Sequence, residues 1–341
     1  VLDALTYAGN IDSLRPEIES GAVTFVHGDI CDSAAVDGLF ERYRPDYVVN
    51  FAAESHVDRS VDNPRPFVET NVLGAQTMLE CARQYLKAGG CLKKFVHVST
   101  DEVYGDLSID FDVPGEDAAL TEALGRPVLL YGREVFSENC PLRPSSPYSA
   151  AKASADMIAL SYHRTFGFPV VITRCSNNYG PYQFPEKLIP LMINNILEGR
   201  PLPVYGRGLN VRDWIHVEDH CAGVLAAAVS GRPGEVYNFG GYSERTNIDI
   251  VRTLIAEVCR LRPDISPESC RIEYVGDRPG HDLRYAINAE RSMAELGWRP
   301  RHDFEQGLRS TVEWYIANRR WVENIVNGEY RLYYDKMYSN R

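Results

Sequence analysis

The chain of 341 residues lacks several patterns that mark common protein classes. Its eight cysteines contain no CxxC pair and its histidines form no HExxH motif, which disfavours a zinc ribbon or a zinc protease. No apolar run approaches the roughly 20 residues of a membrane helix, and no secretory signal opens the sequence. These absences favour a cytoplasmic protein with reduced thiols and no membrane partner. Positive charge is scarce as well, because a net charge of -11 argues against a nucleic-acid partner.

Histidines at a metal-ligand spacing occur in "WIHVEDH", where His216 and His220 stand four residues apart. Trp214, Ile215 and Val217 indicate that this stretch is the end of a strand entering a helix. A histidine pair in that setting is rarely a metal site. We therefore expect no metal in this protein.

Short apolar runs alternate with helical patterns in the first half of the chain. Strand-like runs occupy residues 23–27, 47–51, 94–99 and 170–174, and helical patterns cover residues 34–43, 66–86 and 147–166. This alternation predicts an α/β fold whose parallel sheet is covered on both faces. A doubly wound open sheet and a closed barrel are the two common versions of that architecture.

Two domains are expected, because the alternation weakens after about residue 180. Residues 1–180 would form a Rossmann-like sheet domain. Residues 181–341 would mainly form a smaller α/β lobe, with some segments returning to the first domain. A long insertion at residues 107–143 is rich in Pro, Gly and acidic residues, and loops of that length are commonly lids or mobile surface.

A glycine-rich phosphate-binding turn is also missing. In a dinucleotide-binding sheet the first strand leads into such a turn, and an acidic residue follows about 20 residues later at the end of the next strand. Asp3 suits that acidic position, yet the chain contains neither GxGxxG nor GxxGxxG. We therefore expect the sheet to lack its first strand, because the sequence begins after it.

The strongest candidate for chemistry is "SSPYSAAKAS". Ser146 can cap a helix and Pro147 can occupy its first turn. Tyr148 and Lys152 then lie on one face of that helix. An ammonium lowers the pKa of a nearby phenol from about 10, so this pair could take a proton from a substrate hydroxyl. A surface tyrosine and lysine on an ordinary helix is the plainer interpretation.

Polar residues gather where the predicted strands end, which is the edge at which open α/β sheets bind ligands. "STDE" places Thr100, Asp101 and Glu102 at the end of the run over residues 94–99. Two further strand ends are "GDI", whose Asp29 could hold an adenine edge, and "NFAAESH", where small side chains would let a cofactor approach. Each signal is weak alone, and together they favour a ligand site at this edge.

Five longer motifs indicate a family. "TDEVYGD", "SSPYSAAKAS", "NNYGPYQFPEKLIP", "NVRDWIHVEDH" and "DRPGHDLRYAI" resemble the nucleotide-sugar dehydratases of the extended short-chain dehydrogenase/reductase family, those that act on dTDP-glucose. The resemblance runs from residue 1 to about residue 338. It implies NAD as cofactor and a homodimer in which the helices over residues 66–86 and 147–166 pair across a two-fold axis. The absent glycine-rich turn and the long insertion at residues 107–143 depart from the family pattern.

The resemblance implies conversion of dTDP-glucose to dTDP-4-keto-6-deoxyglucose. In that reaction C4 is oxidised by hydride transfer to NAD, water is eliminated across C5 and C6, and the hydride returns to C6. Tyr148 would take the C4 hydroxyl proton, tuned by Lys152 and with Thr100 orienting the hydroxyl. Glu102 would remove the C5 proton while Asp101 protonates the departing C6 hydroxyl, which requires the two carboxyl groups to have different pKa values.

Binding residues are implied as well. For NAD they are Asp3, Leu5, Thr6, Asp29, Ile30, Ala52, Ala53, Ser55, Thr70, Tyr148, Lys152 and Asn178. For the nucleotide sugar they are Ser55, Thr100, Asn177, Lys187, Leu188, Pro203, Tyr205, Arg212, Asn247, Asp277, Arg278 and His281. A guanidinium such as that of Arg212 matches diphosphate oxygens, although a surface ion pair is the ordinary alternative for a single arginine.

Other functions stay open at this point. A UDP-sugar epimerase or decarboxylase, or a GDP-mannose dehydratase, would use the same scaffold. The two acids of "TDE" favour the dTDP-glucose dehydratase over a plain epimerase, which needs only tyrosine and lysine. A non-catalytic nucleotide-sensing relative would be expected to lack Tyr148 or Lys152, and both are present. Preference for dTDP-glucose over UDP-glucose is not decided by the sequence.

Overall fold

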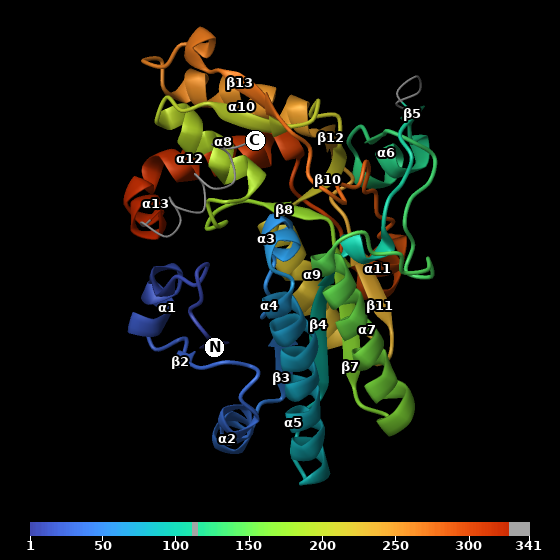
Figure 1. Cartoon of the computed structure of the whole chain (residues 1–341). Helices are drawn as coiled ribbons and strands as arrows, with labels where there is room; N and C mark the ends of the chain where they lie inside the picture. The colour runs from blue at the N-terminus through green and yellow to red at the C-terminus, as the bar shows by residue number, and fades with distance from the viewer. Residues whose placement is uncertain (111–114, 327–341) are drawn as a thin grey trace.

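The computed structural model describes residues 1–110 and 115–326. Its central element in these residues is a parallel sheet with strand order β11-β7-β4-β3 (Figure 1). The strands are β3 (Tyr47–Asn50), β4 (Lys94–Thr100), β7 (Val170–Cys175) and β11 (Val236–Phe239). The strands expected over residues 47–51, 94–99 and 170–174 are therefore confirmed. Phe95, Val96 and Ile172 are fully buried, as expected for strands that are covered on both faces.

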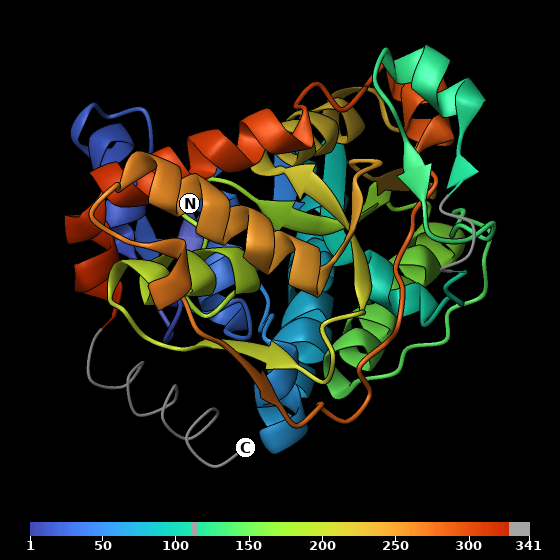
Figure 2. The ribbon, with the colours of Figure 1, turned by 90° about the horizontal axis from the view of Figure 1, so that it is seen from above.

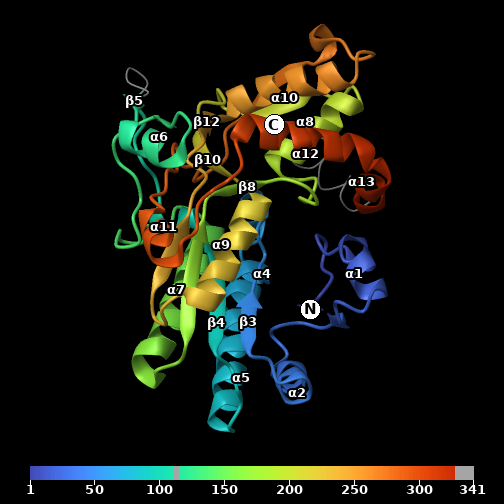
Figure 3. The same ribbon diagram turned by 180° about the vertical axis from the view of Figure 1, so that it is seen from behind.

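Helices cover the two faces of this sheet. On one face lie α5 (Ala75–Lys87) and α7 (Pro147–Phe166), side by side, and on the other lies α9 (Val217–Ser230), which Figure 3 shows from behind. The open, doubly wound version of the α/β fold is thus the one adopted. None of the helices in the described ranges combines the length and the apolarity that a membrane span needs.

Helix α7 has the bounds that its sequence signals predict. Ser146 caps it: its hydroxyl accepts from the Ser149 amide, and the Ser149 hydroxyl accepts from the Ser146 amide in return. Pro147 occupies the first turn, where its missing N–H costs nothing. The helix ends at Gly167, whose φ of 65° is left-handed and therefore suits glycine.

The helix expected over residues 66–86 is divided in three. It consists of α4 (Arg65–Phe67), a π-helical stretch η2 (Val68–Gly74) and α5. A Cβ added at Gly74 would lie 2.6 Å from Cδ1 of Ile30, so this part of the helix passes very close to the segment after β2. A π-helical stretch inside an α-helix is frequently found at a functional site.

A short parallel pair, β1 (Leu2–Asp3) and β2 (Val26–His27), stands apart from the main sheet (Figure 1). The run expected as a strand over residues 23–27 is a strand only in its last two residues. Between and after the pair lie η1 (Ile11–Ser13), α1 (Arg15–Glu19) and α2 (Ser33–Tyr43). Within residues 1–110 and 115–326 no strand pairs with the edge of β3 that faces away from β4. That the sheet lacks its first strand stays a prediction.

A second hydrophobic core lies beyond the carboxyl edge of the sheet. Figure 2 shows its helices from above: α8 (Leu188–Leu197), α10 (Asn247–Leu261) and α12 (Phe304–Ala317). Its strands are β8 (Asn177–Tyr179), β9 (Leu202–Tyr205), β10 (Val211–His216), β12 (Glu244–Thr246) and β13 (Ile272–Val275). Further elements are α3 (Val57–Asp62), η3 (Asp101–Tyr104), η4 (Pro267–Ser269), α11 (Glu290–Leu296) and α13 (Arg319–Ile325). The division of the chain at residue 180 stays a prediction, and its far end at residues 327–341 lies outside the described residues.

The insertion at residues 107–143 contains secondary structure in its described part, and its expected role as a lid or mobile surface stays a prediction. It contains β5 (Gly115–Glu116), α6 (Ala118–Leu124) and β6 (Leu129–Leu130). Val128 and Phe136 are buried in the cores of the molecule. Apolar residues spaced along a sequence rich in Pro and Gly anchor this segment, and residues 111–114 lie outside the described residues.

Candidate active site

The turn after β4 brings a hydroxyl and two carboxyl groups to the carboxyl edge of the sheet. The hydroxyl of Thr100 accepts a hydrogen bond of 3.3 Å from the Glu102 amide and donates one of 3.3 Å to Oδ1 of Asp101. Asp101 is only 2% exposed, and Glu102 beside it keeps partial exposure. Gly105 closes the turn with a φ of 92°, and a Cβ there would lie 2.3 Å from the carbonyl oxygen of Arg143. Position 105 therefore requires glycine.

Helix α7 presents Tyr148 and Lys152 to the same edge. Both side chains are buried, and Nζ of Lys152 donates a 2.6 Å hydrogen bond to the carbonyl of Val98. The ring of Tyr148 meets Phe67 edge-to-face, with 6.3 Å between ring centroids. The structure thus places Tyr148 and Lys152 on one face of α7, as their four-residue spacing predicts, and next to the end of β4, where Thr100 lies.

The two adjacent carboxyl groups experience different surroundings. Burial, together with the nearby carboxylates of Glu102 and Asp213, raises the pKa of Asp101 well above its usual value. Burial also raises the pKa of Glu102, but the cations Arg278, Arg212 and Lys187 oppose that rise. A carboxyl group next to carboxylates keeps its proton, whereas one that faces cations loses it. Asp101 is therefore suited to donate a proton and Glu102 to accept one.

The pKa of Tyr148 differs from the sequence-based expectation. Burial and the carboxylate of Glu102 raise the pKa of its phenol well above 10, while hydrogen bonding with Thr100 acts in the opposite direction. The ammonium of Lys152 was expected to lower the pKa of Tyr148, but this effect does not prevail. The reason is that desolvation disfavours the charged form of every group at this buried edge, and it also lowers the pKa of Lys152.

Segments of the second core supply the cations that face this edge. Nζ of Lys187 donates a 2.7 Å hydrogen bond to the carbonyl of Ser55. The Tyr205 hydroxyl donates to Asp58 at 3.1 Å, and a guanidinium nitrogen of Arg278 lies 3.9 Å from the same carboxylate. Asp58 was not recognised from the sequence, since a single aspartate in a helix carries no local signal.

Arg212 lies deeper than the sequence indicated. Its guanidinium donates to the carbonyls of Val211 and Asp282 at 2.7 and 2.8 Å and lies 4.2 Å from the ring centroid of Tyr285. His281 contacts Oδ1 of Asp277 at 2.6 Å. The predicted contact of Arg212 with a diphosphate stays a prediction.

The other residues expected to bind a nucleotide sugar have diverse positions. Asn177 is part of β8 and pairs with Trp214 of β10, and Asn247 begins α10. Pro203 is buried within β9, and Leu188 packs against the second hydrophobic core. Packing alone accounts for Leu188 and Pro203, and substrate contacts by all four stay predictions.

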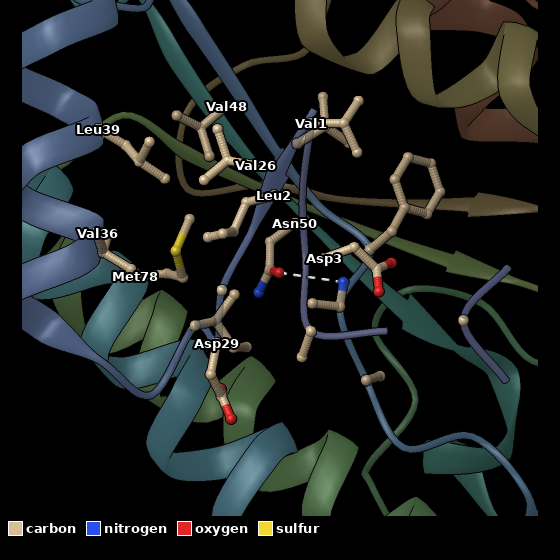
Figure 4. A pocket seen from close by; sticks show the side chains of 18 of the residues that line it. Val1, Leu2, Asp3, Val26, Asp29, Val36, Leu39, Val48, Asn50 and Met78 are labelled. Atoms are coloured by element: carbon tan, nitrogen blue, oxygen red, sulfur yellow. Dashed lines mark hydrogen bonds between the residues drawn. The ribbon is translucent and has the colours of Figure 1, made fainter. Parts of the chain in front are cut away.

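A cavity of about 860 Å³ lies between the β1–β2 pair and β3. Figure 4 shows side chains that line it, among them Val1, Leu2 and Val26 from the β1–β2 segment and Val48 and Asn50 from β3, together with Asp3 and Asp29. The side-chain oxygen of Asn50 accepts from the Ala52 amide at 3.2 Å, which holds the end of β3 in place. A cavity of this size, apolar with a few carboxylates, has the general properties of a cofactor site.

The sequence profile of the NAD dependent epimerase/dehydratase family matches residues 1–240. The dTDP-glucose 4,6-dehydratase of Salmonella typhimurium is 48% identical over 348 residues, covering 100% of this chain and 91% of the relative. This chain belongs to the NAD dependent epimerase/dehydratase family.

Solved structures of family members have the same fold. A dTDP-glucose 4,6-dehydratase from Streptomyces venezuelae, solved with NAD and a further ligand, is 43% identical with a TM-score of 0.82, over 95% of this chain and 89% of that one. The enzyme from Bacillus anthracis in complex with NAD is 44% identical with a TM-score of 0.79 over the same shares. A UDP-glucose 4-epimerase from Thermotoga maritima is 27% identical with a TM-score of 0.74, over 94% of this chain and 91% of that one.

The NAD dependence of the family gives a meaning to the cavity, and its lining fits such a cofactor. Carboxylates can accept hydrogen bonds from ribose hydroxyls and an adenine amino group, and small residues allow a close approach. Seven of the residues expected to bind NAD line the cavity: Asp3, Thr6, Asp29, Ile30, Ala52, Ala53 and Thr70. The sequence analysis missed the apolar lining from α2 and α5, such as Val36, Leu39 and Met78, because side chains of amphipathic helices look like ordinary core residues.

The other residues expected to bind NAD do not line this cavity. Leu5 has a left-handed φ of 47°, and its amide donates to Oδ1 of Asp3 at 2.7 Å. The carbonyl of Ser55 accepts from Lys187, and the amide oxygen of Asn178 lies 3.0 Å from Nδ1 of His220. Tyr148 and Lys152 lie at the end of β4. Contact of these five residues with NAD stays a prediction.

A group of potential metal ligands lies at the start of α9. His216, Glu218 and His302 place one ligand atom each within 4.8 Å of one another, and His220 is not among them. The rings of His216 and His302 stack, with 4.0 Å between centroids and 22° between planes. Nearly parallel rings direct their nitrogen lone pairs side by side, which does not suit a shared ion. That the protein holds no metal stays a prediction.

Proposed function

We propose that this family member is an NAD-dependent hydro-lyase that converts dTDP-glucose to dTDP-4-keto-6-deoxyglucose. The supporting observation is the pair of adjacent carboxyl groups at the end of β4: the pKa of Asp101 is raised well above its usual value, whereas three cations oppose the rise in the pKa of Glu102. An elimination needs one protonated and one ionised group on the same substrate. The dehydratases that are 43–48% identical to this chain support the same conclusion.

The residues at the edge of the sheet divide the reaction between them. NAD, when bound, supplies the hydride acceptor for C4 and the hydride donor for C6. Tyr148, as its phenolate, takes the C4 hydroxyl proton, helped by its hydrogen bond with Thr100, and the ammonium of Lys152 stabilises the phenolate before the transfer. Because the pKa of the Tyr148 phenol is raised, its phenolate is a strong base, and Tyr148 must lose its own proton before it can accept that of the C4 hydroxyl.

Elimination then uses the two carboxyl groups. The C4 ketone makes the C5 hydrogen acidic, and the Glu102 carboxylate removes it. Asp101 donates its proton to the C6 hydroxyl, which leaves as water. Each carboxyl group ends the step in the protonation state opposite to the one in which it began. The proton on Glu102 returns to C5 when the hydride returns to C6. The C4 hydroxyl proton held by Tyr148 offsets the proton that Asp101 gave to the departing water.

The cations of the second core are suited to the anionic part of the substrate. We assign Lys187, Arg212 and Arg278 to the diphosphate and the sugar, because these are the three cations that lower the pKa of Glu102 and therefore face the same space. Tyr205 and His281 lie with 6.0 Å between ring centroids and could flank a base or a sugar. Asp277 holds His281 in place.

A homodimer is the proposed state of assembly. Exposed apolar side chains gather on the helices expected at the two-fold axis: Val68 and Leu73 on η2 and Met157 and Phe166 on α7 are each about half exposed. Light scattering at micromolar concentration should report a dimer. Met157→Glu should shift the mass to a monomer, whereas Tyr274→Glu, at an equally exposed residue of β13, should not.

A cytoplasmic location is also proposed. None of the eight cysteines, all of which lie in the described ranges, forms a disulfide. Free thiols are typical of a reducing compartment.

The decisive experiment is incubation of the protein with NAD and dTDP-glucose, followed by detection in alkali of a 4-keto-6-deoxy product. UDP-glucose is tested in parallel. Formation of that product from dTDP-glucose is expected. A C4 epimer without loss of water would contradict the proposal and indicate an epimerase, and a higher kcat/KM for UDP-glucose would replace the proposed substrate.

A further inference from the structure

A buried polar network lies beneath the proposed active site, and none of its members takes part in the chemistry described above. Arg174 of β7 is 3% exposed. Its Nε donates to Oδ2 of Asp156 at 2.9 Å, and its Nη1 donates to the hydroxyl of Tyr104 at 2.9 Å. Neither partner is more than 2% exposed. One guanidinium therefore bonds two separate elements of the fold.

The two partners of Arg174 belong to the two elements that carry the proposed chemistry. Asp156 lies on α7 four residues after Lys152 and eight after Tyr148, so the three side chains share one face of the helix. Tyr104 is the last residue of η3, the turn that begins with Asp101. Arg174 thus connects the helix of the oxidising pair with the turn of the eliminating pair.

Further contacts hold Tyr104, the residue by which η3 takes part in this connection. The Tyr104 hydroxyl donates to the side-chain oxygen of Asn238 at 2.8 Å, and the Asn238 amide donates to the carbonyls of Phe136 and Asn288 at 3.2 and 3.1 Å. The ring of Tyr104 stacks on that of Phe136 with 5.0 Å between centroids. The hydroxyl therefore has one defined position, between Arg174 and Asn238.

Stability alone is a poor reason for such an arrangement. A buried ion pair repays its desolvation only partly, and replacing one with apolar residues is often neutral or stabilising. A planar guanidinium with fixed donors is, in contrast, well suited to hold two acceptors at a set separation. The elimination requires such a separation, because the ketone formed beside Tyr148 must present C5 to Glu102 and the C6 hydroxyl to Asp101.

We propose that Arg174, Asp156 and Tyr104 form a positioning clamp that sets the distance between Tyr148–Lys152 and Asp101–Glu102, and that the clamp favours elimination after oxidation. This inference rests on the proposed function. None of the three residues touches the substrate. They act through the placement of η3 relative to α7.

Tyr104→Phe tests the clamp, because it keeps the stacked ring and removes the hydroxyl between Arg174 and Asn238. In a single turnover with dTDP-glucose, oxidation at C4 should stay within about twofold of the unmodified protein. Elimination should slow roughly tenfold or more, since misplacement by a fraction of an ångström has effects of that size. Reduced cofactor and the C4 ketone should then accumulate.

Tyr237→Phe is the matched control. Tyr237 is fully buried on β11 next to Asn238, and its hydroxyl bonds the Arg232 amide at 3.1 Å and Glu295 at 2.9 Å, away from η3. Loss of the Tyr237 hydroxyl should lower thermal stability about as much as Tyr104→Phe does. The ratio of the oxidation rate to the elimination rate should stay unchanged. Equal ratios in both variants and the unmodified protein would overturn the proposal.

Amide hydrogen exchange provides a readout that does not need activity. Exchange at residues 101–105 should become faster in Tyr104→Phe and stay unchanged in Tyr237→Phe. Arg174→Lys, which keeps the charge but cannot hold two acceptors, should behave like Tyr104→Phe and serves if that variant folds poorly. Unchanged exchange at η3 in both clamp variants would refute the clamp, while absence of a 4-keto-6-deoxy product from the unmodified protein would refute only the proposed function.

Discussion

The two sides of the proposed site are built very differently. On the side of the chemistry, Asp101, Lys152 and the clamp residues are almost fully buried and are joined by side-chain hydrogen bonds. On the side of the cofactor, Asp3 and Asp29 are exposed, and β1 and β2 pair through only two residues each (Figure 3). The comparison indicates that the catalytic groups are preorganised by packing, whereas the cofactor cavity is formed by short elements with little support of their own.

The largest expected effect on activity comes from a change on the side of the proposed chemistry. Tyr148→Phe should abolish the initial oxidation, because the variant lacks the phenol hydroxyl that is proposed to take the C4 hydroxyl proton with Thr100. General base catalysis is worth about 10²–10⁴ in rate, and we expect a loss near the upper limit. The measurement is the transient appearance of reduced cofactor after mixing with dTDP-glucose. Tyr162→Phe, at the far end of α7, is the control and should keep full activity.

Glu102→Gln should leave oxidation nearly intact and stop elimination. The amide cannot accept the C5 proton, so the rate of product formation should fall by about 10²–10³ while reduced cofactor still forms. Rapid quenching and analysis of the sugar distinguish the C4 ketone from the final product. A variant that makes 4-keto-6-deoxy sugar at a near-normal rate would remove Glu102 from the mechanism.

Binding of the cofactor should stabilise the side of the proposed site that β1 and β2 form. A ligand that binds only the folded state stabilises it by about 2.7 kcal/mol at a concentration of roughly 100 times its Kd. NAD should therefore raise the unfolding midpoint in denaturant. The gain should shrink in Asp3→Asn, because a carboxylate accepts hydrogen bonds more strongly than an amide. Equal gains in both proteins would mean that Asp3 does not contact the cofactor.

His220 lies between the two sides and should make stability depend on pH. Burial lowers its pKa to about 4, its Nδ1 is 3.0 Å from Oδ1 of Asn178, and its ring lies 6.5 Å from that of Phe51 at the cavity. The unfolded chain binds a proton at His220 near pH 6.5 and the folded chain does not, so stability falls as pH falls from about 6.5 to about 4.

The pH dependence of stability that is due to His220 is the smallest of the four effects predicted here, and denaturant unfolding can measure it. Between about pH 7 and about pH 5 the histidine should account for about 2 kcal/mol of lost unfolding free energy. His220→Gln should reduce the pH dependence by that amount. An unchanged difference between the two pH values would show that His220 is protonated in the folded protein.

Much of the site was predictable because its signals are local. The cap at Ser146, Pro147 in the first turn and the four-residue spacing of Tyr148 and Lys152 specify a helix face, and the apolar run before Thr100 specifies a strand end. These features depend on neighbours within a few residues. The sequence therefore determined which groups stand at the carboxyl edge of the sheet.

Only the tertiary structure decided how those groups behave. The cations that act on Glu102 come from residues far along the chain, and the rise in the pKa of Tyr148 results from burial that no spacing encodes. Arg174 meets Tyr104 across 70 positions, through hydrogen bonds that exist only when β4, β7 and α7 pack together. Charge and burial act through space rather than along the chain, so the protonation states of this site are properties of the folded protein alone.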